Sequence, residues 1–328
     1  MRIALDVMGG DFAPEEILVG AKEALASSKT LELMLAGDIE AILKYWPESK
    51  SDQRIEIVHC SEVIGMNEHP AMAYRKKKDA SITVASRLVR DGEAQAVVSA
   101  GSTGAQLAAG LFEIGRMEGV ARPAIASCIP TLKGPRIILD IGANTDSMPD
   151  NLKQFSWLGR IYCRIATGIA NPKVFLLSNG SEAEKGDDLS QKTYQLLMEE
   201  EGLNFCGNVE GRDIFSGDAD VIVTDGFSGN IALKTMEGTA EALFTMMKEA
   251  FMANSRSKLG AALLKPALRR VKSQLDYEEY GGAPLLGLKG LSVVCHGSSK
   301  AKAIRTAILK TDEWIESGLM GKLTEHHF

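Results

Sequence analysis

The 328-residue sequence lacks the short motifs of several common enzyme classes. It contains neither the GxxxxGK[ST] phosphate loop nor the GxGxxG dinucleotide fingerprint. The HExxH zinc motif and the GxSxG nucleophile elbow are also absent. The histidines show no metal-ligand spacing; they are His59, His69, His296, His326 and His327. We therefore expect neither a metal nor a cofactor, and we interpret His326 and His327 as a tail.

Paired cysteines and long apolar runs are lacking too. The cysteines are scattered and form no CxxC pair; they are Cys60, Cys128, Cys163, Cys206 and Cys295. This spacing and the absence of a signal peptide predict reduced thiols in a cytoplasmic protein. No apolar run approaches the ~20 residues of a membrane-spanning helix. A net charge of −6 argues against a nucleic-acid partner, which requires a basic footprint.

What the sequence does contain is a set of short apolar strands that end in small and polar residues. The most distinctive is Val221–Thr224, followed by Asp225, a predicted turn over residues 226–230 and then a helix. Four further strands lead into similar segments: Met8–Asp11, Gly101–Gly104, Ile141–Asp146 and His296–Ser299. Because ligands bind at the carboxyl ends of strands in open α/β sheets, we expect these five segments to form one crevice.

The order of strands and helices predicts the fold class. Strands at Arg2–Val7, Leu31–Leu35 and Ile55–His59 alternate with helices at Glu15–Ser27 and Ile39–Tyr45. This rhythm predicts a three-layer α/β/α fold with a mostly parallel sheet, and residues 122–129 and 136–140 could add a hairpin beside it. Asp79 and Ser81 are candidate caps for a helix through Val89. No linker-like composition interrupts the chain, so we expect a single domain over residues 1–328.

Residues 235–275 depart from this pattern. From Met252 to Leu275 the sequence has no acidic residue and six basic ones: Arg256, Lys258, Lys265, Arg269, Arg270 and Lys272. Apolar residues recur at helical spacing on both sides of a break near Asn254–Ser257, which predicts a projecting helical hairpin. Its apolar stripe fits the hairpin of a second copy in a homodimer. The tip, Leu259–Leu268, also fits a membrane surface, and the sequence leaves both alternatives open.

The strand ends offer neutral donors, and three side chains could add positive charge: Arg75, Lys185 and His296. Such a set binds a small oxyanion and stabilises a negative charge that develops during a reaction. It favours neither a covalent nucleophile nor a redox cofactor. His296 can equally be a loop histidine with satisfied hydrogen bonds, and the run Arg75–Lys78 can be a solvated face.

The same segments resemble the bacterial phosphate acyltransferase family of phospholipid synthesis. The resemblance covers residues 1 to about 317 and rests on these stretches: DVMGGDFAPE, NEHPAMAYRKKKDASI, SAGSTGA, LDIGANTD, GNVEGRDI, DVIVTDGFSGN, YGGAPLLG and HGSS. Ser102 stands where the family usually has Asn, which affects one expected contact. The resemblance implies transfer of a fatty acyl group from acyl carrier protein to inorganic phosphate, giving acyl phosphate. It also implies a fold similar to phosphotransacetylases and β-decarboxylating dehydrogenases, a homodimer and peripheral membrane association. A downstream glycerol-3-phosphate acyltransferase is a further implied partner.

Together these observations predict the site residues. The predicted anion site consists of Gly101, Ser102, Thr103, Asn144, Ser228, Asn230, His296 and Ser298. We assign catalytic roles to Lys185, Asp225 and His296, which would stabilise charge or orient donors. Because acyl carrier protein is strongly acidic in this family, we expect it to dock on exposed basic residues: Arg75, Lys76, Arg256, Lys258, Lys265 and Arg269.

Two other functions stay open at this level. DVMGGD and DIGANTD are similar to the phosphate loops of actin-like ATPases, so a small-molecule kinase is the first alternative. That kinase would require a nucleotide and Mg²⁺. The second alternative is a non-enzymatic membrane or carrier-protein adaptor that uses only the basic segment.

Overall fold

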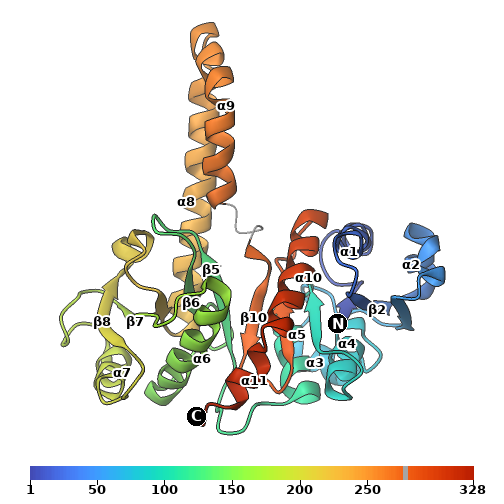
Figure 1. Ribbon diagram of the computed structural model, residues 1–328, viewed down its shortest axis with the longest axis horizontal. Coiled ribbons are helices and arrows are strands. Elements are labelled where there is room, and N and C mark those ends of the chain that lie inside the picture. The colour runs from blue at the N-terminus through green and yellow to red at the C-terminus, as the bar shows by residue number, and fades with distance from the viewer. Residues whose placement is uncertain (276–279) are drawn as a thin grey trace.

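The structure, a computed structural model, describes residues 1–275 and 280–328. Within these residues the strands form one eleven-stranded sheet with helices on both faces (Figure 1). The strands are β1 (Arg2–Asp6), β2 (Glu32–Gly37), β3 (Ile55–His59), β4 (Ala96–Ser99), β5 (Ala124–Ile129), β6 (Arg136–Leu139), β7 (Val174–Ser178), β8 (Phe205–Glu210), β9 (Val221–Val223), β10 (Ala283–Leu286) and β11 (Leu291–Val294). The helices are α1 (Glu15–Ser27), α2 (Ile39–Tyr45), α3 (Pro70–Lys76), α4 (Ser81–Arg90), α5 (Thr103–Ala109), α6 (Pro149–Thr167), α7 (Asp188–Met198), α8 (Gly226–Met252), α9 (Ser255–Leu275), α10 (Ala301–Glu316) and α11 (Leu319–Thr324).

The sheet is mostly parallel, as predicted. Its strand order is β3-β2-β1-β4-β11-β10-β5-β6-β9-β7-β8. The three central pairings, β11 with β10, β10 with β5 and β5 with β6, are antiparallel. The predicted hairpin is therefore present as β5 and β6, in the middle of the sheet, since β10 lies on its other side.

These three reversals correct the expected single crevice. An odd number of antiparallel steps separates β11 from β6, so β6 and β9 run opposite to β1, β4 and β11. The segments after β1, β4 and β11 gather at one edge of the sheet, and those after β6 and β9 gather at the other. Their common site, described below, lies on a face of the sheet rather than at one edge.

Alternate residues along each strand supply the cores of the two faces. On β1, Ile3 and Leu5 join the core beneath α1, α6 and α10, whereas Ala4 joins the core beneath α4 and α5. This alternation follows from the two-residue period of a strand. Each fully buried aliphatic side chain contributes roughly 1.5–3 kcal/mol, so the two cores hold the three layers together.

Most predicted elements lie where expected, and four differ. The short helix α3 and the strand β10 were not anticipated. The predicted turn over residues 226–230 is wrong, because these residues are the first turn of α8. Asp79 and Ser81 do not cap α4: Ala80 occupies the cap position without a side-chain bond, and Asp79 instead accepts from Ser61.

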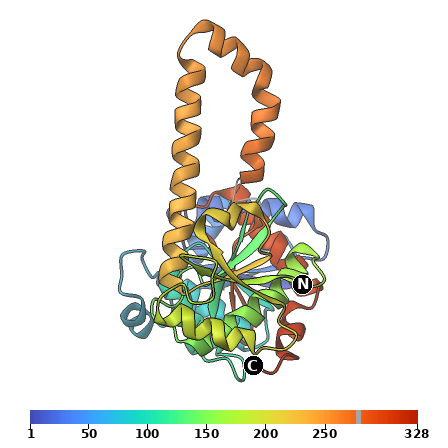
Figure 2. The same ribbon diagram turned by 90° about the vertical axis from the view of Figure 1, so that its left-hand side faces the viewer.

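The helical hairpin projects from the body of the protein, as predicted (Figures 1 and 2). It consists of α8 and α9, and residues 253–254 separate the two helices. Arg270 and Lys272 of the basic segment lie outside the residues whose side chains the structure describes. Within the described part of the chain, no helix combines the length and hydropathy that crossing a bilayer requires.

Candidate active site

The candidate site is a cleft of about 1490 Å³ on the sheet face between α5 and α8. Its floor is formed by β5 and β10, and its wall is one side of α8. Thr103 at the start of α5 and the loop after β11 border it opposite α8. Because α8 starts at one sheet edge and passes the loop after β11, it connects the two sets of strand ends.

Asp140, directly after β6, holds the loop at one end of the cleft. Its carboxylate accepts from the backbone N–H groups of residues 142–144 at 2.8–3.1 Å and from that of Ile125 at 3.1 Å. Burial raises the pKa of Asp140, while these hydrogen bonds act in the opposite direction. The amide of Asn144 donates to Asp140 at 2.9 Å and to the carbonyl of Pro123 at 2.8 Å. Both its protons are used within the framework, so Asn144 shapes the loop.

The first turn of α8 packs directly on this loop. A Cβ atom at Gly229 would collide with the carbonyl oxygen of Asp140, and one at Gly226 would collide with that of Asn144. Glycine is therefore required at both positions for the close approach. Asp225 caps the helix by accepting from the N–H groups of Phe227 and Ser228 at 2.9 Å. Asp225 thus positions the helix rather than facing the cleft.

The other end of the cleft is formed by a contact between α8 and the loop after β11. Lys234 Nζ lies 3.3 Å from His296 Nε2 and 2.7 Å from the Glu237 carboxylate. His296 Nδ1 lies 2.7 Å from the hydroxyl of Ser298. The backbone N–H of Ser298 donates to the same Nδ1 at 3.3 Å. A neutral imidazole accepts at one nitrogen only, so the ammonium of Lys234 and the N–H of Ser298 compete for the ring. The Ser298 hydroxyl thus lies beside the imidazole, and both residues line the cleft.

The segments after β1 and β4 form a compact support beside this end. Asp6 is buried, which raises its pKa, and it accepts from the Ser99 hydroxyl at 2.6 Å. The Ser99 oxygen in turn accepts from the N–H of Gly101 at 3.0 Å. Ser102 caps α5. These residues shape the β4 loop, and Thr103 is the member of this loop that reaches the cleft.

The residues predicted for the anion site and for catalysis therefore divide into three groups. Thr103, Asn230, His296 and Ser298 line the cleft. Gly101, Ser102, Asn144, Asp225 and Ser228 support its edges without lining it. Lys185 lies exposed in the segment after β7 and does not line the cleft.

Sequence reasoning missed Lys234. It follows Asn230 by four residues, so one helical turn brings both side chains to the same face of α8. That spacing was a usable signal, but the segment containing Asn230 was interpreted as a turn. Asn230 donates to the carbonyl of Ile141 at 2.9 Å, which leaves one amide proton toward the cleft.

Two cysteines also line the cleft, Cys128 on its floor and Cys295 after β11. Burial raises the pKa of each thiol to about 12. At neutral pH both are therefore protonated thiols, which are poor nucleophiles.

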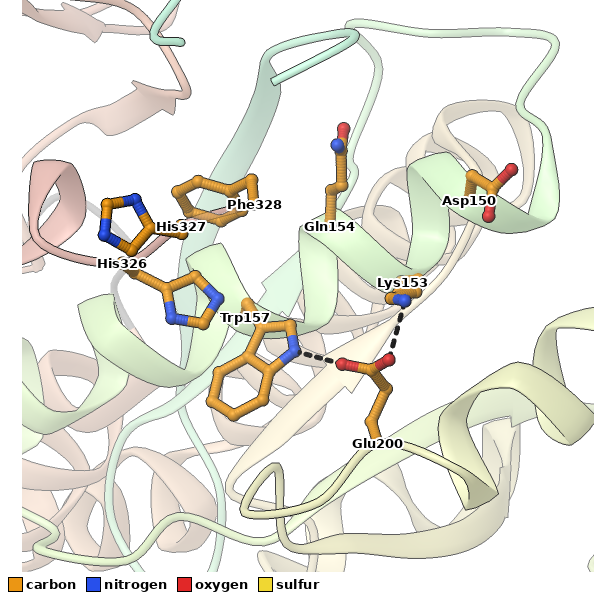
Figure 3. Close-up of a pocket in the computed structure, with 8 residues that line it drawn as sticks. All are labelled: Asp150, Lys153, Gln154, Trp157, Glu200, His326, His327 and Phe328. Carbon is orange, nitrogen blue, oxygen red and sulfur yellow. Dashed lines mark hydrogen bonds and ion pairs between the residues drawn. The ribbon is translucent and has the colours of Figure 1, made fainter. Parts of the chain in front are cut away.

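A second, smaller cavity of about 410 Å³ lies between α6 and the end of the chain (Figure 3). Glu200 accepts from Lys153 at 2.6 Å and from the Trp157 indole at 2.9 Å. The His326 ring packs on Trp157 at 4.4 Å between centroids. The central polar groups of this cavity thus pair with one another. The interpretation of His326 as part of a tail is wrong, because its ring packs on Trp157.

The predicted docking residues occupy two separate surfaces. Arg75 and Lys76 are exposed in the last turn of α3, on the body of the protein. Arg256, Lys258, Lys265 and Arg269 are exposed on α9, in the projecting hairpin (Figure 1).

The chain has an α/β/α fold similar to that of phosphotransacetylases. A phosphotransacetylase from Streptococcus pyogenes superposes with a TM-score of 0.61 at 19% identity, covering 96% of this chain and 94% of that chain. A 4-hydroxythreonine-4-phosphate dehydrogenase from Klebsiella pneumoniae gives 0.53 at 13% identity, covering 99% and 98%. At these identities the likeness establishes the fold alone.

The sequence comparison is more specific. The family model described as fatty acid synthesis protein matches residues 1–322. A phosphate acyltransferase from Heliobacterium modesticaldum is 53% identical over 328 residues, covering 99% of this chain and 97% of the relative. The chain belongs to the fatty acid synthesis protein family, and it is an acyltransferase.

Proposed function

We propose that this acyltransferase moves a fatty acyl group from acyl carrier protein to inorganic phosphate, giving acyl phosphate for the synthesis of phosphatidic acid. The observation that supports phosphate as the acceptor is the meeting of Lys234 and His296 across the cleft at 3.3 Å. This contact places a cation among the neutral donors of Asn230, Ser298 and Thr103. A doubly charged oxyanion fits such a set.

In the proposed reaction a phosphate oxygen attacks the carbonyl carbon of the acyl thioester. A carbon–oxygen bond forms, and the electrons of the carbon–oxygen double bond move to the carbonyl oxygen. When this intermediate collapses, the carbon–sulfur bond breaks and the thiolate leaves with its electron pair. The Lys234 ammonium and the amide of Asn230 would hold the phosphate, and the Ser298 hydroxyl would donate to the charged oxygens.

Direct attack by phosphate agrees with the state of the nucleophilic side chains. Cys128 and Cys295 are protonated, since burial raises the pKa of each to about 12.

The remaining predicted site residues would act on the framework. Gly101, Ser102, Asn144, Asp225 and Ser228 would keep the donors in position through the hydrogen bonds and caps described above. A catalytic role for Lys185 stays a prediction.

Acyl carrier protein would reach the cleft from the basic surfaces. Attraction between an acidic carrier and exposed Lys and Arg side chains raises the association rate and is weakened by salt. Arg75→Glu with Lys76→Glu, and separately Arg256→Glu with Lys258→Glu, should raise the KM for the acyl carrier protein. The pair that leaves this KM unchanged does not form the docking surface.

We further propose a cytoplasmic homodimer that associates peripherally with the membrane.

One assay tests the proposal against its alternatives. Purified protein is incubated with palmitoyl–acyl carrier protein and phosphate, and acyl phosphate is trapped with hydroxylamine. We expect acyl hydroxamate that depends on phosphate and is independent of ATP and Mg²⁺. A requirement for ATP would support the kinase, and no acyl phosphate with or without ATP would support the adaptor.

A further inference from the structure

The cleft continues well beyond the polar end formed by Lys234 and His296. From there it follows α8 outward along the hairpin (Figure 2). Apolar side chains line this stretch on α8 at helical spacing: Met236, Ala240, Leu243, Phe244 and Met247. On the opposite side lie Ile129 of β5 and Val294 of β11, and at the far end lie Leu268 and Val271 of α9. We call this stretch, from Lys234 to Met247, the apolar groove.

The apolar groove has the length of a long acyl chain. Thirteen residues separate Lys234 from Met247, and at about 1.5 Å per residue they span roughly 20 Å of helix. With carbon–carbon bonds of about 1.5 Å, an extended chain of sixteen carbons is also roughly 20 Å long. The polar candidate site lies at one end of the groove, and the apolar stripe of α8 continues from it, which matches the polarity of an acyl thioester. Glu241, Thr245 and Lys248 border the cleft beside this stripe.

We propose that the apolar groove binds the acyl chain, with the thioester at Lys234 and the methyl end near Met247. The length of α8 between these points then sets the preferred chain length. This inference takes its substrate class from the proposed function. It adds the position of the acyl chain and the part of α8 that determines the preferred chain length.

Burial of the chain predicts how the rate depends on chain length. Each methylene that enters the groove should raise kcat/KM about fourfold, which corresponds to ~0.8 kcal/mol. The gain should stop near sixteen carbons, where the chain reaches Leu268 and Val271. A phosphate acyltransferase that bound only the thioester would show no such dependence.

The decisive variant is Ala240→Trp. Ala240 lies six residues, or about 9 Å of helix, beyond Lys234, so a large side chain there should block the groove midway. Ala242→Trp is the matched control, because Ala242 is exposed on the same helix and does not line the cleft. Both variants should keep the wild-type melting temperature within a few degrees.

The variants are compared with butanoyl– and palmitoyl–acyl carrier protein as donors. For Ala240→Trp we expect kcat/KM to fall at least tenfold with the palmitoyl donor and to stay unchanged with the butanoyl donor. Ala242→Trp should resemble wild type with both donors. Equal loss for both donors in Ala240→Trp, or unchanged palmitoyl transfer, would overturn the proposal while leaving phosphate acyl transfer intact.

A binding measurement separates failure of the groove from failure of the proposed function. A fluorescent long-chain fatty acid should bind Ala240→Trp at least tenfold more weakly than wild type or Ala242→Trp. This difference is expected even if no acyl phosphate is formed by any variant. Equal binding by all three proteins would reject the groove irrespective of activity.

Discussion

At the scale of single residues, two buried carboxyl groups position the donors of the cleft. Asp140 accepts from four backbone N–H groups and the Asn144 amide, and Asp6 accepts from the Ser99 hydroxyl. Both therefore act on the framework. The side chains that face the cleft, Lys234 and His296, come from different elements and meet only because that framework is in place.

Lys234→Met should lower kcat/KM for phosphate about ten- to a hundredfold. A hydrogen bond to a charged partner contributes roughly 1.5–3 kcal/mol, and methionine keeps the length of the side chain without the donor. Lys248→Met, farther along the same helix, is the control and should leave the KM for phosphate unchanged. Steady-state kinetics with varied phosphate measure both, and an unaltered Lys234→Met enzyme would remove this lysine from the site.

Asp140→Asn should destabilise the protein, because an amide nitrogen replaces one acceptor oxygen among converging N–H donors. Each donor left unpaired in the interior costs roughly 1–3 kcal/mol. Urea unfolding measures the loss. Asp146→Asn is the control: Asp146 is 89% exposed, and its ion pair with Arg122 at 3.6 Å should contribute little. Equal stability of the two variants would contradict the role given to Asp140.

At the scale of elements, helix ends and their partners decide local geometry. The first turn of α8 is held by Asp225 and by the two glycines that approach the Asp140 loop. On α6, Trp157 is covered by the His326 ring at the end of the chain (Figure 3). Burial lowers the pKa of His326 below its ordinary value of 6.5.

This shift predicts that the chain end leaves α6 as the medium is acidified. The docked state favours neutral His326, so docking is complete above pH 6.5 and is lost as the pH falls through the lowered pKa. Tryptophan emission should shift to longer wavelength over that interval, as Trp157 becomes exposed to water. The His326→Ala variant should lack this change in emission, and the His327→Ala variant should retain it. If the change persists in His326→Ala, another group causes it.

At the scale of the whole molecule, the hairpin is the most unusual feature. Large apolar residues are exposed on both of its helices, including Leu243 at 54%, Met246 at 64% and Leu263 at 77%. Side chains of this kind, gathered on one projecting element, are typical of an interaction surface.

We expect the hairpins of two copies to pack together, so the wild type should sediment as a dimer. Met246→Asp places a charge in this contact and should yield monomers, and Met246 does not line the apolar groove. Thr245→Asp adds a charge at an exposed polar position of the same helix and should remain dimeric. A wild type that sediments as a monomer ends this proposal.

The tip of α9 has the properties of a membrane-surface helix, with exposed Leu259, Leu263 and Leu264 beside basic residues. Apolar burial and attraction to anionic lipid should act together. In a flotation assay the wild type should rise with anionic vesicles. The Leu263→Glu/Leu264→Glu variant should float less with the same vesicles, and the wild type should float less with vesicles of neutral lipid. If wild type and variant float equally, the hairpin serves dimerisation only.

By itself, the sequence determined most elements, the fold class, the family and the presence of Asn230, His296 and Ser298 at strand and helix ends. These features have local signals: two-residue and 3.6-residue periods, and glycines at turns. It did not determine that β10 pairs between β11 and β5, or that β6 and β9 therefore run opposite to β1. Periodicity indicates which face a side chain occupies, but not which distant strand lies beside it or in which direction. For the same reason only the tertiary structure brought Lys234 to His296, because sixty-two residues separate the two and no local pattern joins them.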